Sequence, residues 1–290
     1  IILLMIIWLA SYPKSGNTWL RFFIISLLLK ENNEVSLKHL EGIRQFPTNY
    51  HFRDFSISKA DLGNLNKISE YWIAAQKKIN SDNKIRFFKT HNALCKVDNN
   101  IFTNEENTLG TIHIVRDPRN VLSSLNNHFH HKSLEESKKF ILDERKGLFS
   151  KSKIEQNNIF ALPQVIGSWK THYNSWKLIK KNYLLVRYED LIEKPELEFK
   201  RIANYLEPLV RLKFSDENVG RAVELSSFDR LKKIEEKEGF VESAKNIETG
   251  KKETFFNLGP NNDWKKNLDK NITKEINEKF AIEMGELGYL

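Results

Sequence analysis

Residues 11–19 combine a lysine with small residues in a pattern that suits anion binding. The segment reads Ser-Tyr-Pro-Lys-Ser-Gly-Asn-Thr-Trp and lies between two apolar stretches, residues 6–11 and 18–30. Where a loop leads from a strand into a helix, the first N–H groups of the helix point toward a bound anion. Lys14 precedes Gly16, whereas the lysine of a Walker A loop follows the second glycine. Taken alone, the segment also suits a plain β-turn with a solvated lysine.

Lys89 and His91 are candidates for proton transfer and charge stabilisation. They lie two residues apart at the end of an apolar run, residues 85–89. An extended backbone therefore directs both side chains to the same side. Histidine is a general base near neutral pH, and lysine can stabilise a leaving oxygen. A histidine at the end of a strand can equally be a hydrogen-bonded structural residue.

Arg116 and Ser124 form a second candidate anion site. Arg116 ends the apolar run of residues 111–116, and Ser124 follows two helical turns later. A guanidinium group can donate two parallel hydrogen bonds to one phosphate. Two other interpretations stay open. Arg116 could pair with Asp117 or Glu189, or Asp117 could hold Mg²⁺ in a kinase-like or NTPase-like site with a shifted lysine.

In this order along the chain, the segments resemble the sulfotransferases that use 3′-phosphoadenosine 5′-phosphosulfate (PAPS). The family's 5′-phosphosulfate loop is similar to residues 12–19, its catalytic Lys-Thr-His segment to residues 89–91, and its 3′-phosphate motif to Arg116 with Ser124. A Tyr-Glu-Asp segment at Tyr188 and a closing loop at residues 255–264 extend the resemblance over almost the whole chain.

The resemblance implies a role for individual residues. His91 would deprotonate the acceptor, while Lys14 and Lys89 would stabilise the leaving phosphate, and no metal would be required. PAPS would be the co-substrate, and its binding residues would be Lys14, Ser15, Gly16, Asn17, Thr18, Trp19, Arg116, Ser124, Tyr188 and Gly259. Asn17 replaces a threonine of the family, but its amide can still donate hydrogen bonds.

The chain departs from the family pattern at two places. Asn92 and Ala93 follow His91 where Leu-Pro is frequent, which changes the loop after the expected base. Asn257 and Leu258 stand where an Arg-Lys pair would hold the 3′-phosphate. We therefore expect weaker or differently arranged binding of the 3′-phosphate, and the candidates for compensation are Lys251, Lys252 and Lys265.

Short apolar runs that alternate with helical patterns predict the frame for these residues. The expected strands are residues 6–11, 85–89, 111–116 and 183–187, and the expected helices are residues 18–30, 119–129, 163–181 and 196–206. This alternation is typical of an α/β protein with a mostly parallel, doubly wound sheet, whose ligands bind beyond the carboxyl ends of the strands. We expect one domain, residues 5–290, with residues 1–4 as an upstream extension. The resemblance implies a P-loop NTPase-like arrangement.

Composition limits the partners but does not name the acceptor. The 290 residues carry a net charge of +8 and a single cysteine, Cys95, which excludes a disulfide framework and indicates a cytoplasmic protein. The apolar stretch of residues 1–10 is too short for a transmembrane segment of ~20 residues. Basic residues are scattered, so nucleic acid is not expected as a partner and a non-catalytic binding module ranks last. A small-molecule, glycan or lipid hydroxyl, or an amine, could be the acceptor, and the oligomeric state stays open.

Overall fold

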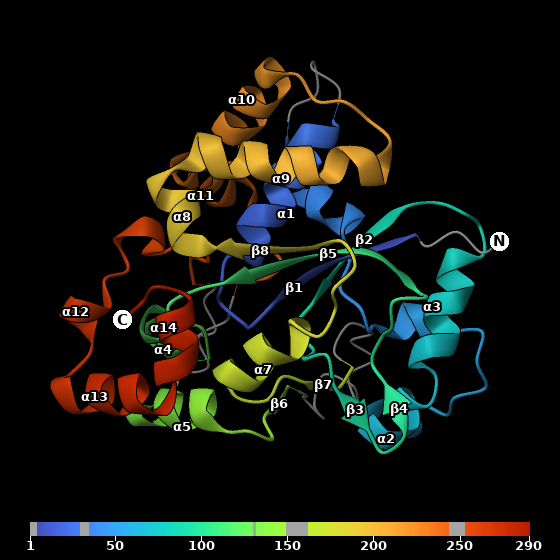
Figure 1. The fold of residues 1–290 in the computed structure, drawn as a ribbon, viewed down its shortest axis with the longest axis horizontal. Helices are drawn as coiled ribbons and strands as arrows, with labels where there is room; N and C mark the ends of the chain where they lie inside the picture. Colours follow the sequence, from blue (N-terminus) through green and yellow to red (C-terminus); the bar gives the residue numbers. More distant parts are fainter. Residues whose placement is uncertain (1–4, 30–34, 130–131, 149–161, 244–252) are drawn as a thin grey trace. The chain divides into compact units, whose positions relative to one another are not determined.

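The computed structural model describes residues 5–29, 35–129, 132–148, 162–243 and 253–290 (Figure 1). The chain forms two compact units, each assembled from separate stretches. The first unit comprises Ile1–Tyr12, Ile43–Ile114 and Asp143–Leu185, and the second comprises Pro13–Gly42, Val115–Leu142 and Val186–Leu290. The chain passes from the first unit to the second after Tyr12, Ile114 and Leu185. Each of these positions lies near the carboxyl end of a strand.

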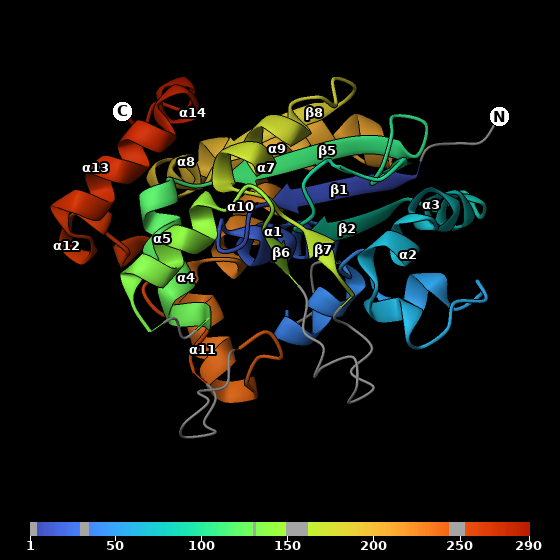
Figure 2. The same ribbon diagram turned by 90° about the horizontal axis from the view of Figure 1, so that it is seen from below.

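A four-stranded sheet organises the fold. Its strands are β1 (Ile6–Ser11), β2 (Arg86–Thr90), β5 (Thr108–Val115) and β8 (Tyr183–Arg187), in the order β2-β1-β5-β8 (Figures 1 and 2). β1 runs parallel to both β2 and β5, with Ala10 paired to Thr90 and Ser11 to Ile114. The predicted α/β class with a parallel sheet is thereby confirmed. β5 begins earlier than predicted because Thr108 and Gly110 already pair with β1.

The core of the first unit surrounds β1, whose six residues are all buried. Trp8 lies at its centre: its indole N–H donates to Thr108 Oγ1 at 3.0 Å, and its ring contacts three phenylalanines. The buried residues of this cluster are Ile6, Trp8, Ala10, Phe46, Phe52, Ile68, Trp72, Ala75, Phe88, Phe102, Leu162, Trp176 and Ile179. Because both faces of β1 are covered, the strand is apolar throughout rather than alternating.

The other elements of the first unit are short. Before β2 lie η2 (Asn49–Phe52), η3 (Asp61–Gly63), α2 (Leu65–Ser69) and α3 (Trp72–Asn80), and after it the hairpins β3 (Lys96–Val97) with β4 (Asn100–Ile101), and β6 (Gly147–Leu148) with β7 (Gln164–Val165). The predicted helix of residues 163–181 is wrong in length. α7 spans only Trp169–Trp176, because residues 164–165 pair as a strand and Ser168 caps the helix.

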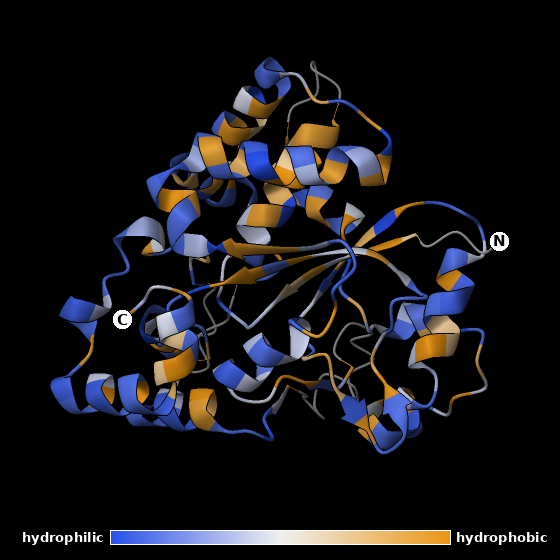
Figure 3. Ribbon diagram, in the orientation of Figure 1, coloured by the Kyte–Doolittle hydropathy of each residue, from blue (hydrophilic) through white to orange (hydrophobic). Residues whose placement is uncertain are grey.

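Helices dominate the second unit. They are α1 (Asn17–Leu28), η1 (Leu37–Gly42), α4 (Pro118–Phe129), α5 (Leu134–Leu142), α8 (Tyr188–Glu193), α9 (Pro195–Val210), α10 (Asp216–Leu225), α11 (Phe228–Glu238), η4 (Gly259–Asn261), α12 (Trp264–Asn267), α13 (Lys270–Lys279) and α14 (Ala281–Glu286). α1 packs on α9 through Phe23 and Phe199, whose rings stack at 4.2 Å. β5 and β8 are largely hydrophobic and α12 is hydrophilic (Figure 3). The predicted helices of residues 119–129 and 196–206 are confirmed: each begins one residue earlier, at Pro118 and Pro195, and the second continues to Val210.

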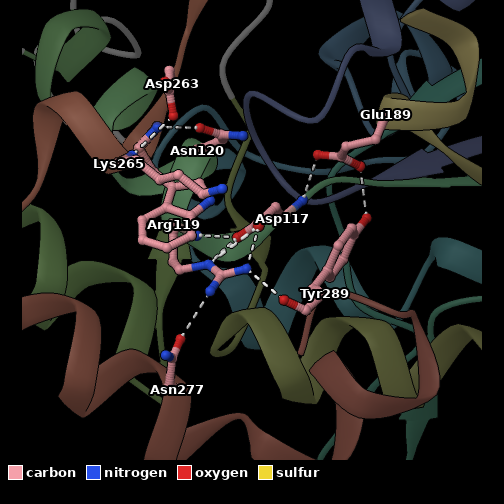
Figure 4. A network of polar contacts seen from close by, with 9 residues as sticks. Asp117, Arg119, Asn120, Glu189, Asp263, Lys265, Asn277 and Tyr289 are labelled. Atoms are coloured by element: carbon pink, nitrogen blue, oxygen red, sulfur yellow. Dashed lines mark hydrogen bonds and ion pairs between the residues drawn. The ribbon is translucent and has the colours of Figure 1, made fainter. Parts of the chain in front are cut away.

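A buried polar network holds α4 to the last helices of the chain (Figure 4). Arg119 donates from Nε and Nη2 to the carboxylate of Asp117, from Nη1 to Asn277, and from Nη2 to the carbonyl of Tyr289. The guanidinium also lies 3.9 Å from the ring centroid of Trp264. Glu189 accepts the hydrogen bonds of the Asp117 N–H and the Tyr289 hydroxyl. The network therefore links the segments that come after β5 and β8.

We expect Arg119→Met to destabilise the protein by about 3–5 kcal/mol, because it leaves the Asp117 carboxylate buried without its cation. The two side chains are each only 6% exposed. Urea unfolding measures the change. Lys200→Ala is the matched control, since the exposed pair of Lys200 with Asp216 contributes at most about 1 kcal/mol. Equal losses for the two variants would contradict a structural role for the network.

Candidate functional site

The loop before α1 has the backbone shape of an anion cradle. Lys14 and Gly16 both have positive φ, 67° and 99°, on either side of Ser15. Left-handed residues in such alternation curve the N–H groups around a concavity that binds anions. Gly16 caps α1 without a side-chain hydrogen bond, and the first turn contains no acidic residue. Neither the capping residue nor an acidic residue of the first turn therefore offsets the positive end of the helix.

Ser15 tests whether this cradle fits a phosphate or sulfate group. Its side chain is 1% exposed, and its hydroxyl has no hydrogen-bond partner among the described residues. Leaving a buried hydroxyl unpaired costs about 1–3 kcal/mol, a cost that a bound anion would remove. Asn17 and Thr18 are also buried beside it, at the start of α1. The loop thus fits an anion better than a plain solvated turn.

Arg116 lies at this loop. Its Nη1 donates to the carbonyl of Lys14 at 3.1 Å, and its guanidinium lies 4.2 Å from the ring centroid of Tyr188. Trp19 meets the same tyrosine edge-on at 5.7 Å. Burial raises the pKa of the Tyr188 hydroxyl. The structure thus brings together four predicted donor-binding residues from three separate segments: Lys14, Trp19, Arg116 and Tyr188.

Two further contacts at this loop involve Phe255, the first residue of the predicted closing loop, and Glu242, which no sequence pattern assigned to the site. The ammonium of Lys14 lies 4.3 Å from the ring centroid of Phe255, which precedes the Gly259 turn of the predicted closing loop. Glu242 accepts a hydrogen bond from the Thr18 hydroxyl at 3.2 Å and pairs with Arg21 at 2.6 Å. No motif distinguishes Glu242, so only the structure identifies it.

Asp117 is engaged in a way that disfavours the magnesium interpretation. Its carboxylate accepts two or more hydrogen bonds from Arg119, which neutralises its charge. A Walker B acid instead directs its oxygens toward a hydrated metal ion. The kinase-like alternative is therefore not favoured.

The remaining predicted donor residues lie on other parts of the second unit. Ser124 is half-buried on α4. Gly259 has a φ of 50°, and a Cβ atom there would approach the Phe228 ring within 2.1 Å, so only glycine fits. Lys265 lies 5.8 Å from the Trp264 ring centroid. Lys251 and Lys252 lie outside the described residues, so compensation for Asn257 and Leu258 stays a prediction.

The first unit contains the candidate general base. β2 ends at Thr90, so the strand stops one residue before His91. The chain turns there, because the N–H of Asn92 donates to the Thr90 hydroxyl. His91 Nδ1 lies 2.8 Å from the carbonyl oxygen of Ser11. Nδ1 also lies 3.3 Å from the Ser11 hydroxyl oxygen. A carbonyl only accepts, so a bond to it requires the proton on Nδ1 and leaves Nε2 with the lone pair. This tautomer suits a base.

Lys89 is 9% exposed and lies at the edge of the sheet. Its backbone N–H donates to Arg44 and its carbonyl accepts from Phe46, so the segment at Gln45 continues the sheet beside β2. This pairing fixes the backbone of Lys89 on both sides. Lys89 belongs to the first unit, whereas the donor loop from Pro13 onward belongs to the second.

Comparison with known proteins relates the whole chain to one family. The sulfotransferase domain model matches residues 6–288. Cytosolic sulfotransferase 12 of Arabidopsis thaliana is 26% identical over 298 residues, which cover 94% of this chain and 76% of that protein. Sulfotransferase 1B1 of Canis lupus familiaris is 23% identical, with 94% and 80% covered.

Solved structures agree in fold. A mouse sulfotransferase aligns with a TM-score of 0.58 at 20% identity, covering 97% of this chain and 85% of that one. A retinol dehydratase aligns with a TM-score of 0.60 at 19% identity, covering 98% and 82%. The α/β fold and the family predicted from the motifs are both confirmed: the chain belongs to the sulfotransferase family.

Proposed function

We propose that this protein transfers a sulfuryl group from PAPS to a hydroxyl group of an acceptor. The observation that carries the proposal is the cradle at α1, where the buried Ser15 hydroxyl lies between two residues with positive φ and Arg116 binds the Lys14 carbonyl. The mouse sulfotransferase and the retinol dehydratase were both determined with PAP, the product that remains after transfer. The family assignment supports the same donor.

The donor needs two anion sites and an aromatic surface. In the proposal, Lys14, Ser15, Gly16, Asn17 and Thr18 hold the 5′-phosphosulfate, and Arg116 with Ser124 holds the 3′-phosphate. Trp19 and Tyr188 offer ring faces to adenine, and Gly259 offers its N–H. The guanidinium of Arg116 is already fixed by Lys14 and Tyr188, so little conformational entropy is lost when it binds a phosphate.

The reaction requires one proton transfer and one displacement at sulfur. His91 removes the hydroxyl proton of the acceptor through Nε2, and the acceptor oxygen forms a bond to sulfur. The bond between sulfur and the bridging phosphate oxygen breaks, so PAP leaves with the electron pair of that bond. Lys14 and Lys89 stabilise the negative charge that develops on the leaving phosphate. Positioning and electrostatics supply the rate enhancement, as in phosphoryl transfer.

The acceptor is proposed to be a small molecule with a hydroxyl group. Androsterone and retinol are present in solved structures of retinol dehydratase. A screen for the acceptor should also include glycans, lipids and amines. A cytoplasmic location is proposed by analogy with the plant relatives, which are named cytosolic sulfotransferases. Among the described helices, none is both long and apolar enough to cross a bilayer.

We expect PAP to raise the melting temperature and ATP with Mg²⁺ to leave it unchanged, because a ligand stabilises only the state that binds it. Arg116→Met should weaken PAP binding by about 10- to 100-fold, since it removes a charge-assisted phosphate contact. Isothermal titration gives the dissociation constants. Arg53→Met, which removes an exposed arginine of the first unit, should leave them unchanged. Equal protection by ATP with Mg²⁺ would instead support the kinase-like alternative.

We expect His91→Ala to lower kcat by about 10²- to 10⁴-fold, because it removes the general base. PAP affinity should remain within about twofold of the parent value. Initial rates with labelled PAPS and a mixture of phenol and alcohol acceptors give kcat, and titration gives the affinity. A variant that lost PAP binding and activity together would show that His91 serves donor binding rather than proton transfer.

A further inference from the structure

A buried carboxylate of α11, Glu235, holds the backbone of the closing loop in the second unit. It accepts hydrogen bonds from the N–H groups of Phe255 at 2.7 Å and Phe256 at 2.9 Å, and from the Ser243 hydroxyl at 2.6 Å. The side chain is only 7% exposed. Backbone N–H groups form stronger hydrogen bonds with a carboxylate than with a neutral acceptor. Two separate stretches of chain, at Ser243 and at Phe255, are therefore fixed to one side chain.

Aromatic rings pack against the same stretch of the closing loop. The ring of Phe256 stacks on that of Phe240 with centroids 6.0 Å apart, and it meets Phe228 edge-on at 6.2 Å. Phe240 also meets Phe255 edge-on at 5.0 Å. Both Phe240 and Phe256 are buried. The hydrogen bonds to Glu235 fix the backbone and these contacts fix the rings, so Phe255 is held in one orientation.

Phe255 connects this anchored segment to the donor loop. The ammonium group of Lys14 lies 4.3 Å from the centroid of its ring, a distance at which a cation is attracted to a ring face. A lysine side chain otherwise has many rotamers, and the contact restricts them. A group that is already in place loses less entropy when a ligand binds. The Phe255 ring therefore prepares Lys14 for an anion.

The closing loop of this chain depends on an anchor of this kind. Asn257 and Leu258, which stand in place of the family's Arg-Lys pair, are both exposed and uncharged. The attraction between a phosphate and basic side chains at these two positions therefore does not order the loop. The carboxylate of Glu235 orders it from the inside, before any ligand is bound.

We propose that Glu235 is a positioning residue for the donor site. It fixes the backbone of Phe255, and the Phe255 ring holds the ammonium of Lys14 where the 5′-phosphosulfate binds. The inference rests on the proposed function, because Lys14 is assigned to the donor there. Glu235 itself contacts neither the donor loop nor the proposed reacting atoms in this assignment, so it acts through Phe255.

Two glutamine substitutions on α11 separate positioning from charge. Glu235→Gln and Glu236→Gln each remove one negative charge, but Glu236 is exposed. By charge alone, loss of an anion would strengthen the binding of the anionic PAP. We instead expect Glu235→Gln to raise the dissociation constant of PAP by about 3- to 10-fold, because the glutamine amide group does not accept from a backbone N–H. Glu236→Gln should leave the constant within about twofold of the parent value.

A double-mutant cycle tests whether Glu235 acts through Phe255. Phe255→Leu removes the ring beside Lys14 and should weaken PAP binding by itself. Glu235→Gln should then add little, so the double variant should lose clearly less affinity than the product of the two separate effects. Isothermal titration gives the four dissociation constants. Effects that simply multiply would overturn the proposal.

The position of Lys14 can be observed without donor or turnover. In protein labelled with carbon-13 lysine, the ε-CH₂ protons of Lys14 should resonate upfield, because they lie near the face of the Phe255 ring. The signal is assigned by its absence from Lys14→Arg. Glu235→Gln should move it toward the position of an exposed lysine, and Glu236→Gln should leave it in place.

If Glu235→Gln does not fold, Ser243→Ala replaces it in both measurements, because it removes one of the three donors to the carboxylate. Its effects should be smaller and have the same direction. A Lys14 signal that stays in place overturns the proposal, as does PAP binding that is unchanged or tighter. If the parent protein does not bind PAP, the proposed function fails, and the Lys14 signal alone then decides whether Glu235 positions this lysine.

Discussion

The parallel pairing of β1 with β2 and β5 is the constraint on which the rest of the structure depends. The register Ala10–Thr90 and Ser11–Ile114 ends the three strands at a common edge. The donor loop, the His91 turn and Arg116 each begin within two residues of one of these strand ends. Parallel strands need crossover connections, so segments distant in sequence are brought to the same edge. Without this register, the three strands would not end at one edge of the sheet.

Buried polar groups then hold the residues that come directly after the strands. In the second unit, Arg116 binds the carbonyl of Lys14, so the arginine supports the loop that it is proposed to complement. Arg119 and Glu189 tie the segments after β5 and β8 to the end of the chain. A buried charge is costly unless it is paired and hydrogen-bonded. The network of Figure 4 satisfies this condition for Asp117 and Arg119.

The departures from the family pattern have different consequences. At Asn92, the amide provides an acceptor for Val165 and keeps the turn bound to the α7 segment. The change of sequence therefore preserves an ordered loop after His91. Asn257 and Leu258 are both exposed and uncharged. The glycine at position 259 is required by its positive φ and by the Phe228 ring, which leaves no room for a Cβ atom. The 3′ end of the donor thus relies on Arg116 and Ser124 in the proposal.

The sequence by itself determined the fold class, the four main strands and the family. Apolar runs of strand length are unambiguous when a sheet is buried on both faces, and the loop of residues 12–19 carries its residues in one continuous segment. Only the tertiary structure decided that α7 begins at Trp169, that Asp117 is held by Arg119, and that Glu242 contacts Thr18. These features depend on contacts between residues far apart in the chain. The spacing of residues along the chain does not predict such contacts, because burial and pairing arise only when the strands assemble.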